Sequence, residues 1–425
     1  MNRPIAVPLV AGVVISIVAI LFAAGSDGRV QAQSVPSPAV AYLQAVNSIV
    51  DNRQTDLAHV TAVANAAADV YVRDGESIGA AGDPMFVWEL SARAGGLRQI
   101  EAYGPFSNPA WKGLVLYGLP TREVSAAATE IAAIRGNGVR VILFGTSERM
   151  DELHRRGIFA DWEISNFATS QERVCRNGSA CLAAPVNGVA NIVAGWQFTA
   201  EFVAALTRRG KMPSVWQSAA VNGAVERNAS LASVRLHSHE PRPSAEGALG
   251  TEYVDQLRRQ LALLNDGELA NIENLASHVT TARKSGAQAY VLRDGHAVAH
   301  ALAQEGVPTD TFVDGNVNIG DVHPKPADLV FLLGYNRRYS SAEWERIARE
   351  SYSVGAKVAY SFAIHDDGEV AALTEGDLLI RQHWGIGDAE VAVPDYDVKM
   401  FPVSGVIQNV ILYMIMANSA AATQP

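Results

Sequence analysis

The chain has 425 residues, 48% of them hydrophobic and 18% charged, and its formal net charge is −10. This balance excludes a mostly disordered chain, because it supplies enough apolar surface for sizeable cores. It also makes the chain a poor non-specific binder of nucleic acid, which needs Lys and Arg on its phosphates, so we expect no nucleic-acid partner.

The first 33 residues have the pattern of an export signal. Arg3 precedes an uncharged apolar run over residues 5–24, and Val30-Gln31-Ala32 fits the small-residue rule for signal cleavage. The run also has the ~20 residues that can span a bilayer, and we find no comparable run after residue 24. We therefore expect residues 1–33 to be a cleaved signal peptide or a retained membrane anchor. Either alternative places the rest of the chain in the periplasm or outside the cell, with membrane contact only through this segment.

Short apolar runs then alternate with stretches in which apolar residues recur at helical spacing. Strands are expected at residues 76–81, 112–118, 139–145, 288–293, 328–334, 356–362 and 377–382. Helices are expected at residues 38–50, 55–72, 85–95, 122–135, 187–209, 250–264, 268–284, 296–305, 341–354 and 404–418. The alternation of strand and helix predicts an α/β fold with parallel sheets.

The two cysteines, Cys175 and Cys181, flank the turn-forming residues Arg-Asn-Gly-Ser. In an oxidising compartment this spacing favours a local disulfide. The gap is too long for a CxxC redox motif, and no further residue with zinc-ligand spacing lies near the pair.

The order of elements occurs twice along the chain. Each copy has two helices, then three strands with helices between them, and closes with Pro-Val-x-Gly and a long helix, at residues 185–188 and 402–405. Residues 235–249, between the copies, are rich in Pro, Ser and charge and lack apolar periodicity, which predicts a linker. We therefore expect one domain over residues 36–234 and a second over residues 250–419.

Several segments follow the motifs of one family. Residues 82–97 are similar to a G-H-S-H-M…E-L…R-A-G-G-L motif, and residues 213–229 to a P-V-x-x-S-A-N-V-x-G-G-D-E-x-N-A tail. In the second copy, residues 387–404 follow P-G-D-A-x-V…K-V-G-P-x-S, and Gly295-His296 keeps the G-H of the first loop. The chain thus resembles the sugar isomerase (SIS) domain family, and within it the uncharacterised SIS-domain phosphosugar-binding proteins. The resemblance implies two tandem three-layer α/β/α domains packed as a pseudo-dimer within one chain, and it leaves a homo-oligomer open.

In this family, phosphosugars are bound by loops at the carboxyl ends of the strands and by the helix N-termini behind them, where N–H groups and the helix dipole favour an anion. Ser and Thr hydroxyls complete that site, but most of them are missing here, and Asp83 would repel a phosphate. The resemblance therefore implies a carbohydrate derivative as the ligand, with a phosphosugar as one alternative. The candidate ligand-binding residues are Gly82, Asp83, Thr121, Arg122, Asn187, Gly295, His296, Asn336, Arg337 and Ser404.

Isomerisation of a sugar phosphate needs a base beside C1 and C2 and an acid for ring opening. The candidates for these roles are Glu89, His296 and Asp388. His296 and His300 have a helical spacing that can hold a metal, but no third ligand is identified, so we expect no metal and no cofactor. Aromatic faces commonly hold neutral sugars, and four aromatic residues lie near the predicted loop ends: Trp88, Tyr117, Tyr335 and Trp384.

Three functions stay open at this point. The first is an exported SIS-like protein that binds a carbohydrate derivative without retained isomerase activity. The second is an enzyme, either a sugar-phosphate isomerase or an amino-sugar lyase. The third is a two-lobed periplasmic solute-binding protein, although such proteins usually cross between lobes more than once, whereas this repeat predicts one crossing, at residues 235–249. The chain lacks HExxH, GxSxG, Walker A and GxGxxG motifs, so the enzyme classes that use them have no support.

Overall fold

A computed structural model gives the fold of the chain, and residues 36–425 form one compact unit. The N-terminal 35 residues, both cysteines and several loops lie outside the described part. The structure describes residues 36–74, 77–104, 113–121, 124–169, 184–238, 241–307, 310–335, 342–364 and 377–421.

A five-stranded sheet forms the centre of the first half, with the strand order β2-β1-β3-β4-β5. Its members are β1 (Ser77–Gly82), β2 (Ile100–Ala102), β3 (Gly113–Gly118), β4 (Arg140–Gly145) and β5 (Trp162–Ser165). All neighbouring strands are parallel. Every residue of β3 is buried, as expected for an apolar strand that is covered on both faces of its sheet.

The second half repeats this topology. Its sheet has the order β10-β9-β8-β6-β7, which is the order of the first sheet once each strand is matched with its counterpart. The strands are β6 (Ala289–Arg293), β7 (Val313–Asp314), β8 (Leu329–Leu333), β9 (Lys357–Ala363) and β10 (Leu378–Gln382), and all pair in parallel. A separate antiparallel pair, β11 (Ala389–Val391) and β12 (Met400–Pro402), precedes the last helix. The duplication predicted from the sequence is therefore confirmed.

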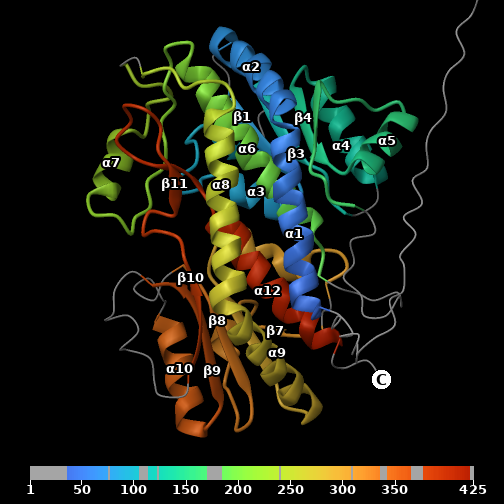
Figure 1. The fold of residues 1–425 in the computed structure, drawn as a ribbon, viewed down its shortest axis with the longest axis vertical. Helices are drawn as coiled ribbons and strands as arrows, with labels where there is room; N and C mark the ends of the chain where they lie inside the picture. Colours follow the sequence, from blue (N-terminus) through green and yellow to red (C-terminus); the bar gives the residue numbers. More distant parts are fainter. Residues whose placement is uncertain are drawn as a thin grey trace, which may run out of the picture. The chain divides into compact units, whose positions relative to one another are not determined.

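Helices surround both sheets (Figure 1). In the first half they are α1 (Pro38–Thr55), α2 (Leu57–Asp74), α3 (Pro84–Leu90), α4 (Val124–Gly136), α5 (Ser147–Arg155), α6 (Asn187–Thr207) and α7 (Ala224–Ser230). In the second half they are α8 (Ala248–Leu263), the π-helical turn Leu264–Glu268, α9 (Leu269–Lys284), the 3-10 helices Val298–Ala303 and Ile319–Asp321, α10 (Ala342–Val354) and α12 (Ser404–Ala421). Local signals set some starts: the side chain of Ser37 accepts a hydrogen bond from the N–H of Val40, with Pro38 as the first helical residue of α1.

The halves exchange helices and share one core. Helix α1 of the first half packs on α12 of the second, while α8 of the second half packs on α6 of the first. Figure 1 shows α1 and α8 running alongside each other, and they are in contact. One hydrophobic cluster includes side chains from both halves, among them Tyr42, Trp196, Leu257 and Tyr413. The expected pseudo-dimer within one chain is therefore present.

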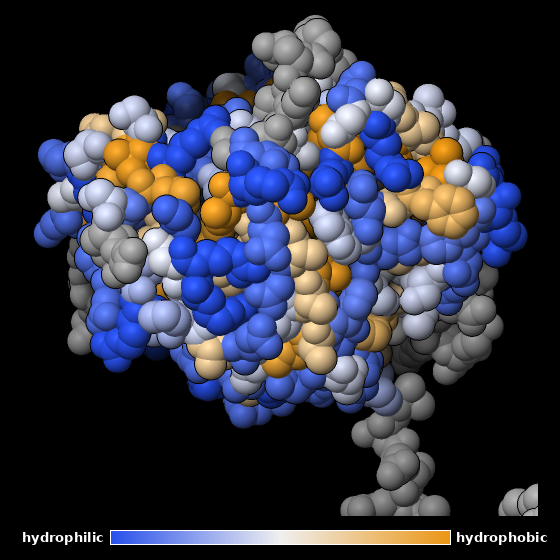
Figure 2. Space-filling view, turned by 90° about the horizontal axis from the view of Figure 1, so that it is seen from above, coloured by the Kyte–Doolittle hydropathy of each residue, from blue (hydrophilic) through white to orange (hydrophobic). Residues whose placement is uncertain are grey.

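All 21 residues of helix α6 are buried. Contrary to the expectation from sequence, it is long and apolar enough to cross a membrane, but its burial makes it a core helix. On the face shown in Figure 2, hydrophobic residues gather in separate small groups among hydrophilic ones. Scattered apolar residues of this kind are normal for a protein surface.

The seven predicted strands are all present, each with bounds within one residue of the prediction. Three predicted helices differ. The helix expected at residues 38–50 continues to Thr55, the one expected at residues 85–95 ends at Leu90, and the one expected at residues 296–305 is a 3-10 helix over Val298–Ala303. Helix α8 begins at Ala248, inside the predicted linker, so the boundaries 36–234, 235–249 and 250–419 stay a prediction.

Candidate functional site

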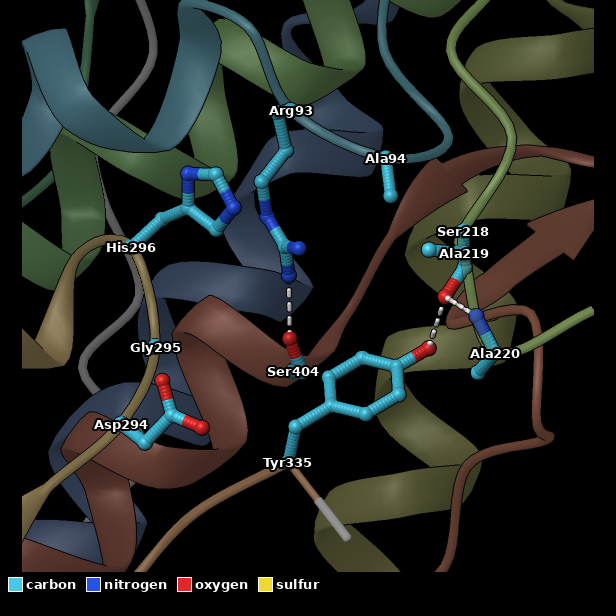
Figure 3. Close-up of a pocket in the computed structure, with 10 residues that line it drawn as sticks. All are labelled: Arg93, Ala94, Ser218, Ala219, Ala220, Asp294, Gly295, His296, Tyr335 and Ser404. Carbon is cyan, nitrogen blue, oxygen red and sulfur yellow. Dashed lines mark hydrogen bonds between the residues drawn. The ribbon is translucent and has the colours of Figure 1, made fainter. Parts of the chain in front are cut away.

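A cavity of about 230 Å³ lies where the two halves meet. The first half contributes Arg93 and Ala94 from the loop after α3, and residues 218–220 from its last segment. The second half contributes residues 294–296 after β6, Tyr335 after β8, and Ser404 at the start of α12 (Figure 3). Three of these elements are the carboxyl ends of parallel strands or the helix behind them, which is where open α/β sheets bind ligands.

A buried ionic cluster forms one wall of the cavity. The guanidinium of Arg93 donates its Nε–H to Glu89 at 3.2 Å, and its Nη2 to both Asp388 and Ser404. Asp388 in turn accepts hydrogen bonds from the hydroxyl of Ser404 at 2.6 Å and from its backbone N–H at 2.9 Å, so it caps the N-terminus of α12. Arg93, from the first half, is thereby fixed against the second half. Its remaining nitrogen, Nη1, has no hydrogen-bond partner among the described residues.

Glu89 is fully buried beneath this wall and does not line the cavity. Its carboxylate also accepts hydrogen bonds from the indole N–H of Trp196 and the backbone N–H of Ala297, both at 3.3 Å. Burial raises the pKa of Glu89, and Arg93 partly opposes that effect. Burial likewise raises the pKa of Asp388, with Arg93 again opposing it. The geometry gives Glu89 the role of a positioning residue for Arg93.

His296 lies at the edge of the cavity as a neutral imidazole. Its Nδ1 is 3.2 Å from the carbonyl oxygen of Trp88, which can only accept, so Nδ1 carries the proton and Nε2 is an acceptor. Burial, together with the charge of Arg93, lowers the pKa of His296 to about 3. In Figure 3 a ring nitrogen of His296 points towards Arg93.

The imidazole of His300 stacks on the ring of Trp88, with 5.3 Å between the ring centroids. It therefore makes a different contact from that of His296. In the described ranges, no three His, Cys, Asp or Glu side chains are grouped closely enough to hold a metal.

Asp294 directly follows β6 and lines the cavity with its carboxylate (Figure 3). No described residue donates a hydrogen bond to its side chain, and although the residue is exposed at the cavity, partial loss of hydration raises its pKa. On the opposite wall, the Tyr335 hydroxyl donates to the carbonyl of Ile386 at 2.8 Å and lies 3.1 Å from the hydroxyl of Ser218. The cavity thus combines one cationic donor, one unpaired carboxylate and several hydroxyl groups.

The matching position in the first half is closed by internal hydrogen bonds. Asp83 follows β1 as Asp294 follows β6, and it is fully buried. Its Oδ1 accepts from the backbone N–H of Met85 and from the side-chain amide of Gln304, each at 2.9 Å. Asn187, the counterpart of Ser404, donates to the carbonyl of Leu119 at 3.1 Å and accepts from Asn166 at 2.9 Å.

The two contacts that cross between the halves are related by the duplication. Arg93 lies ten residues after Asp83, and Gln304 lies ten residues after Asp294. Each reaches into the other half: Arg93 to the start of α12, and Gln304 to Asp83. Gln304 therefore closes the site in the first half, whereas Arg93, at the equivalent position, forms a wall of the cavity beside the second half.

Only some of the predicted ligand-binding residues lie at the cavity. Gly295, His296 and Ser404 line the cavity, whereas Gly82, Asp83, Thr121 and Asn187 do not. Gly82 has a φ of +86°, and a Cβ there would lie 2.2 Å from the carbonyl oxygen of Gly118, so its glycine is required by the tight strand end. Arg122, Asn336, Arg337, Cys175 and Cys181 lie outside the described residues.

A scan against protein-family models and a search of curated proteins found no match. Among solved structures, the C-terminal domain of glucosamine-fructose-6-phosphate aminotransferase from Francisella tularensis aligns with 91% of this chain and 95% of its own, with a TM-score of 0.50 and 9% sequence identity. That domain has the SIS fold. This chain has the SIS fold as well. Tagatose-6-phosphate ketose/aldose isomerase from Escherichia coli aligns with 91% of this chain and 92% of its own, with a TM-score of 0.47 and 10% identity.

The resemblance seen in the motifs is thus confirmed for the fold. At 9% identity the alignment does not assign a role to any residue of this chain, and only the chain's own contacts bear on the site. Sequence reasoning missed Arg93 and Asp294 as cavity residues. Asp294 could have been found from the sequence, because it directly follows the strand predicted at residues 288–293. Arg93 lies in the R-A-G-G-L segment of the first motif, but the sequence did not show that its side chain reaches the cavity, because it does so through the contact between the halves.

We expect Asp83 to make the stability of the protein fall as pH rises. Burial raises its pKa from 3.8 to about 6. The protonated form therefore stabilises the fold fully below pH 3.8, and this contribution is lost as pH rises through about 6. The loss is up to about 3 kcal/mol, from 1.36 kcal/mol per pKa unit.

The Asp83→Asn variant cannot ionise at this position and should lack that pH dependence. In urea unfolding at pH 4.5, 6 and 7.5, the free energy of unfolding of the variant should increase relative to that of the natural protein as pH rises. Asp321→Asn removes the same charge from the exposed surface and serves as the control. Parallel pH profiles for the natural protein and Asp83→Asn would contradict the expectation.

Proposed function

We propose that this chain binds a small carbohydrate derivative in the cavity between its halves. The observation that carries the proposal is the mixture of groups on the cavity wall: the guanidinium of Arg93, the free carboxylate of Asp294, the acceptor nitrogen of His296 and the hydroxyls of Ser218 and Tyr335. A ligand rich in hydroxyl groups offers both donors and acceptors to such a wall. The volume of about 230 Å³ is below the ~300–1,000 Å³ of sites for drug-sized molecules, which favours a monosaccharide.

The shared fold supports the choice of ligands to test. The Francisella tularensis enzyme is named for hexose phosphates and hexosamines, so hexose derivatives are the first class to examine. Fold similarity does not fix a substrate, and the cavity carries the argument.

We also propose that isomerase activity is absent. A general base works best with a pKa near the operating pH. His296, with a pKa of about 3, is a weak base at neutral pH. Glu89 does not line the cavity, and Asp388 is occupied by Arg93 and Ser404. The three catalytic candidates from the sequence are thus poorly placed for proton transfer to a sugar.

A two-lobed solute-binding protein is the less favoured alternative. Such proteins close two separately packed lobes around a ligand by a hinge motion. Here α1 packs on α12 and α8 packs on α6, so the two halves share a core that resists hinge opening.

Export from the cytoplasm and a Cys175–Cys181 disulfide remain part of this proposal. They are supported by the signal-like residues 1–33 and by the short, turn-forming spacing of the cysteines. Intact-mass analysis of the protein recovered from its host tests both, because it reads the N-terminal residue and the loss of two hydrogens. A full-length, fully reduced chain with no membrane association would overturn them.

The binding proposal is tested by calorimetry and thermal shift with the full-length protein. The probes are glucose, galactose, mannose, fructose, their 6-phosphates, the hexosamines and the N-acetylhexosamines. We expect saturable stabilisation by at least one of them, and no hydrogen–deuterium exchange at C1 or C2 of the sugar. Ala220→Trp should fill the cavity and abolish binding, whereas Ala229→Trp on the exposed side of α7 should not.

The outcomes separate the alternatives. Absence of binding by every probe would end the carbohydrate proposal. Exchange at C1 or C2 that depends on the cavity would replace it with the isomerase. Binding that Ala220→Trp leaves unchanged would move the ligand to another place on the protein.

A further inference from the structure

The charges around the cavity have an uneven balance. Two carboxylates, Glu89 and Asp388, surround the single guanidinium of Arg93, so this buried cluster carries a formal charge of −1. Asp294 adds a second negative charge, and neutral His296 adds none. Among the described residues that line the cavity, Arg93 is the only cation, and its charge is already matched by its two partners.

As far as the described lining residues go, this balance opposes a phosphorylated ligand. A sugar phosphate carries about −1.5 to −2 charges near neutral pH, as other phosphomonoesters do. It would need a cation that is not already paired, or several free donors. Arg93 offers only Nη1, and the exposed carboxylate of Asp294 faces the same space (Figure 3).

The equivalent position in the first half shows which kind of hydrogen-bond donor fits beside a carboxylate at this place in the fold. There the equivalent carboxylate, Asp83, receives an N–H hydrogen bond from the side chain of Gln304. In the second half no described side chain takes that place beside Asp294. An N–H donor supplied by the ligand would complete the second site as Gln304 completes the first.

We propose that the ligand is an amino sugar with a free, protonated amine that pairs with Asp294, and that it carries no phosphate. This inference rests on the proposed binding of a carbohydrate derivative in the same cavity. The amine supplies both a positive charge and N–H groups, which the described lining residues do not offer to Asp294. The Nη1 of Arg93 then donates to a ring oxygen or hydroxyl, and Nε2 of His296 accepts from a hydroxyl.

The test measures affinity by titration calorimetry with the full-length protein at pH 6.5, where the amine is protonated. The probes are glucosamine, galactosamine and mannosamine, each compared with its parent hexose, its N-acetyl derivative and its 6-phosphate. We expect one hexosamine to bind at least tenfold more tightly than all three of its comparison sugars. Acetylation removes the charge of the amine, so the N-acetyl derivative separates charge from size.

Two variants assign the preference to one carboxylate. Asp294→Asn should remove the tenfold preference for the amine while leaving the binding of the parent hexose measurable. Asp321→Asn lowers the net negative charge equally, at an exposed position outside the cavity, and should keep the preference. Added salt should weaken hexosamine binding more than hexose binding, because the pairing is between charges.

Equal affinity for a hexosamine and its N-acetyl derivative would overturn this inference and leave the carbohydrate proposal standing. Tighter binding of a 6-phosphate would do the same and would return the phosphosugar as the ligand. Failure of every sugar to bind would overturn the proposed function itself, and this inference with it.

Discussion

The Arg93→Met variant is expected to lose about 3–5 kcal/mol of folding free energy at pH 7.5, because it removes the only cation from a buried ionic cluster. Arg93 is 2% exposed, and Glu89 and Asp388 are fully buried. Without the guanidinium, both carboxylates must stay buried and ionised without a partner or take up protons. The hydroxyl of Ser404 also loses a donor. The variant should lose the binding of any cavity ligand as well.

The loss should depend on pH. Burial already raises the pKa of Glu89 and of Asp388, and Arg93 opposes this in each case. Removing Arg93 raises both pKa values in the folded state further. The stability that protonation provides is therefore lost as pH rises through those values, so the variant should be closer to the natural protein at pH 5 than at pH 7.5.

Chemical unfolding at the two pH values measures this effect. The control is Arg156→Met, which breaks an ion pair with Glu152 between side chains that are 46% and 38% exposed. Exposed pairs of this kind contribute about 0–1 kcal/mol. If Arg93→Met cost no more than this control, the cluster would not hold the halves together as we describe.

Gly405→Ala is expected to have a comparably large effect, although it adds only one methyl group. A Cβ at residue 405 would lie 2.2–2.3 Å from the carboxylate of Glu89. That carboxylate is held by Arg93, Trp196 and Ala297, so it cannot move aside without breaking buried hydrogen bonds. Breaking a buried ion pair in this way costs about 3–5 kcal/mol. The measurement is again the free energy of unfolding.

Two glycines provide matched controls for this substitution. Gly188 is the counterpart in α6, where a Cβ would meet the flexible side chain of Met85 at 3.0 Å, so Gly188→Ala should cost much less. Gly136, at the end of α4, has open space around it, and Gly136→Ala should be neutral or slightly stabilising. A double-mutant cycle adds a further check: in a Glu89→Ala background, the additional cost of Gly405→Ala should largely disappear. Equal costs in the two backgrounds would show that Glu89 is not the clashing group.

The strands were predictable because each is a short, continuous apolar run, as in the fully buried strand β3. The edge strands β2, β5 and β7 were not predicted, since they have only three, four and two residues and are partly exposed. The α-helix expected at residues 296–305 was wrong because the spacing of its apolar residues does not distinguish two types of helix. Val298 and Ala301 have the spacing of either an α-helix or a 3-10 helix, and the chain adopts the tighter form.

The site was predictable only in part. Topology placed His296 and Ser404 at one sheet edge, because the carboxyl ends of parallel strands meet there. Which of the two equivalent edges stays open could not be predicted. That depends on Gln304 reaching Asp83 and on Arg93 reaching Ser404, and each of these contacts joins residues more than 200 positions apart. Such pairings have no local pattern in the sequence.

The exchange of helices between the halves affects the order in which parts of the chain can fold during synthesis. Helix α1 is among the first parts of the described chain to be synthesised, yet its main partner, α12, is the last. The backbone N–H of Ala39 donates to the side chain of Asn418, across a separation of 379 residues. Contacts that close such long loops form slowly, because the entropy of closure must be overcome first. The apolar face of α1 therefore stays without its main partner until α12 has been synthesised, so we expect the docking of α12 to be a late step in folding.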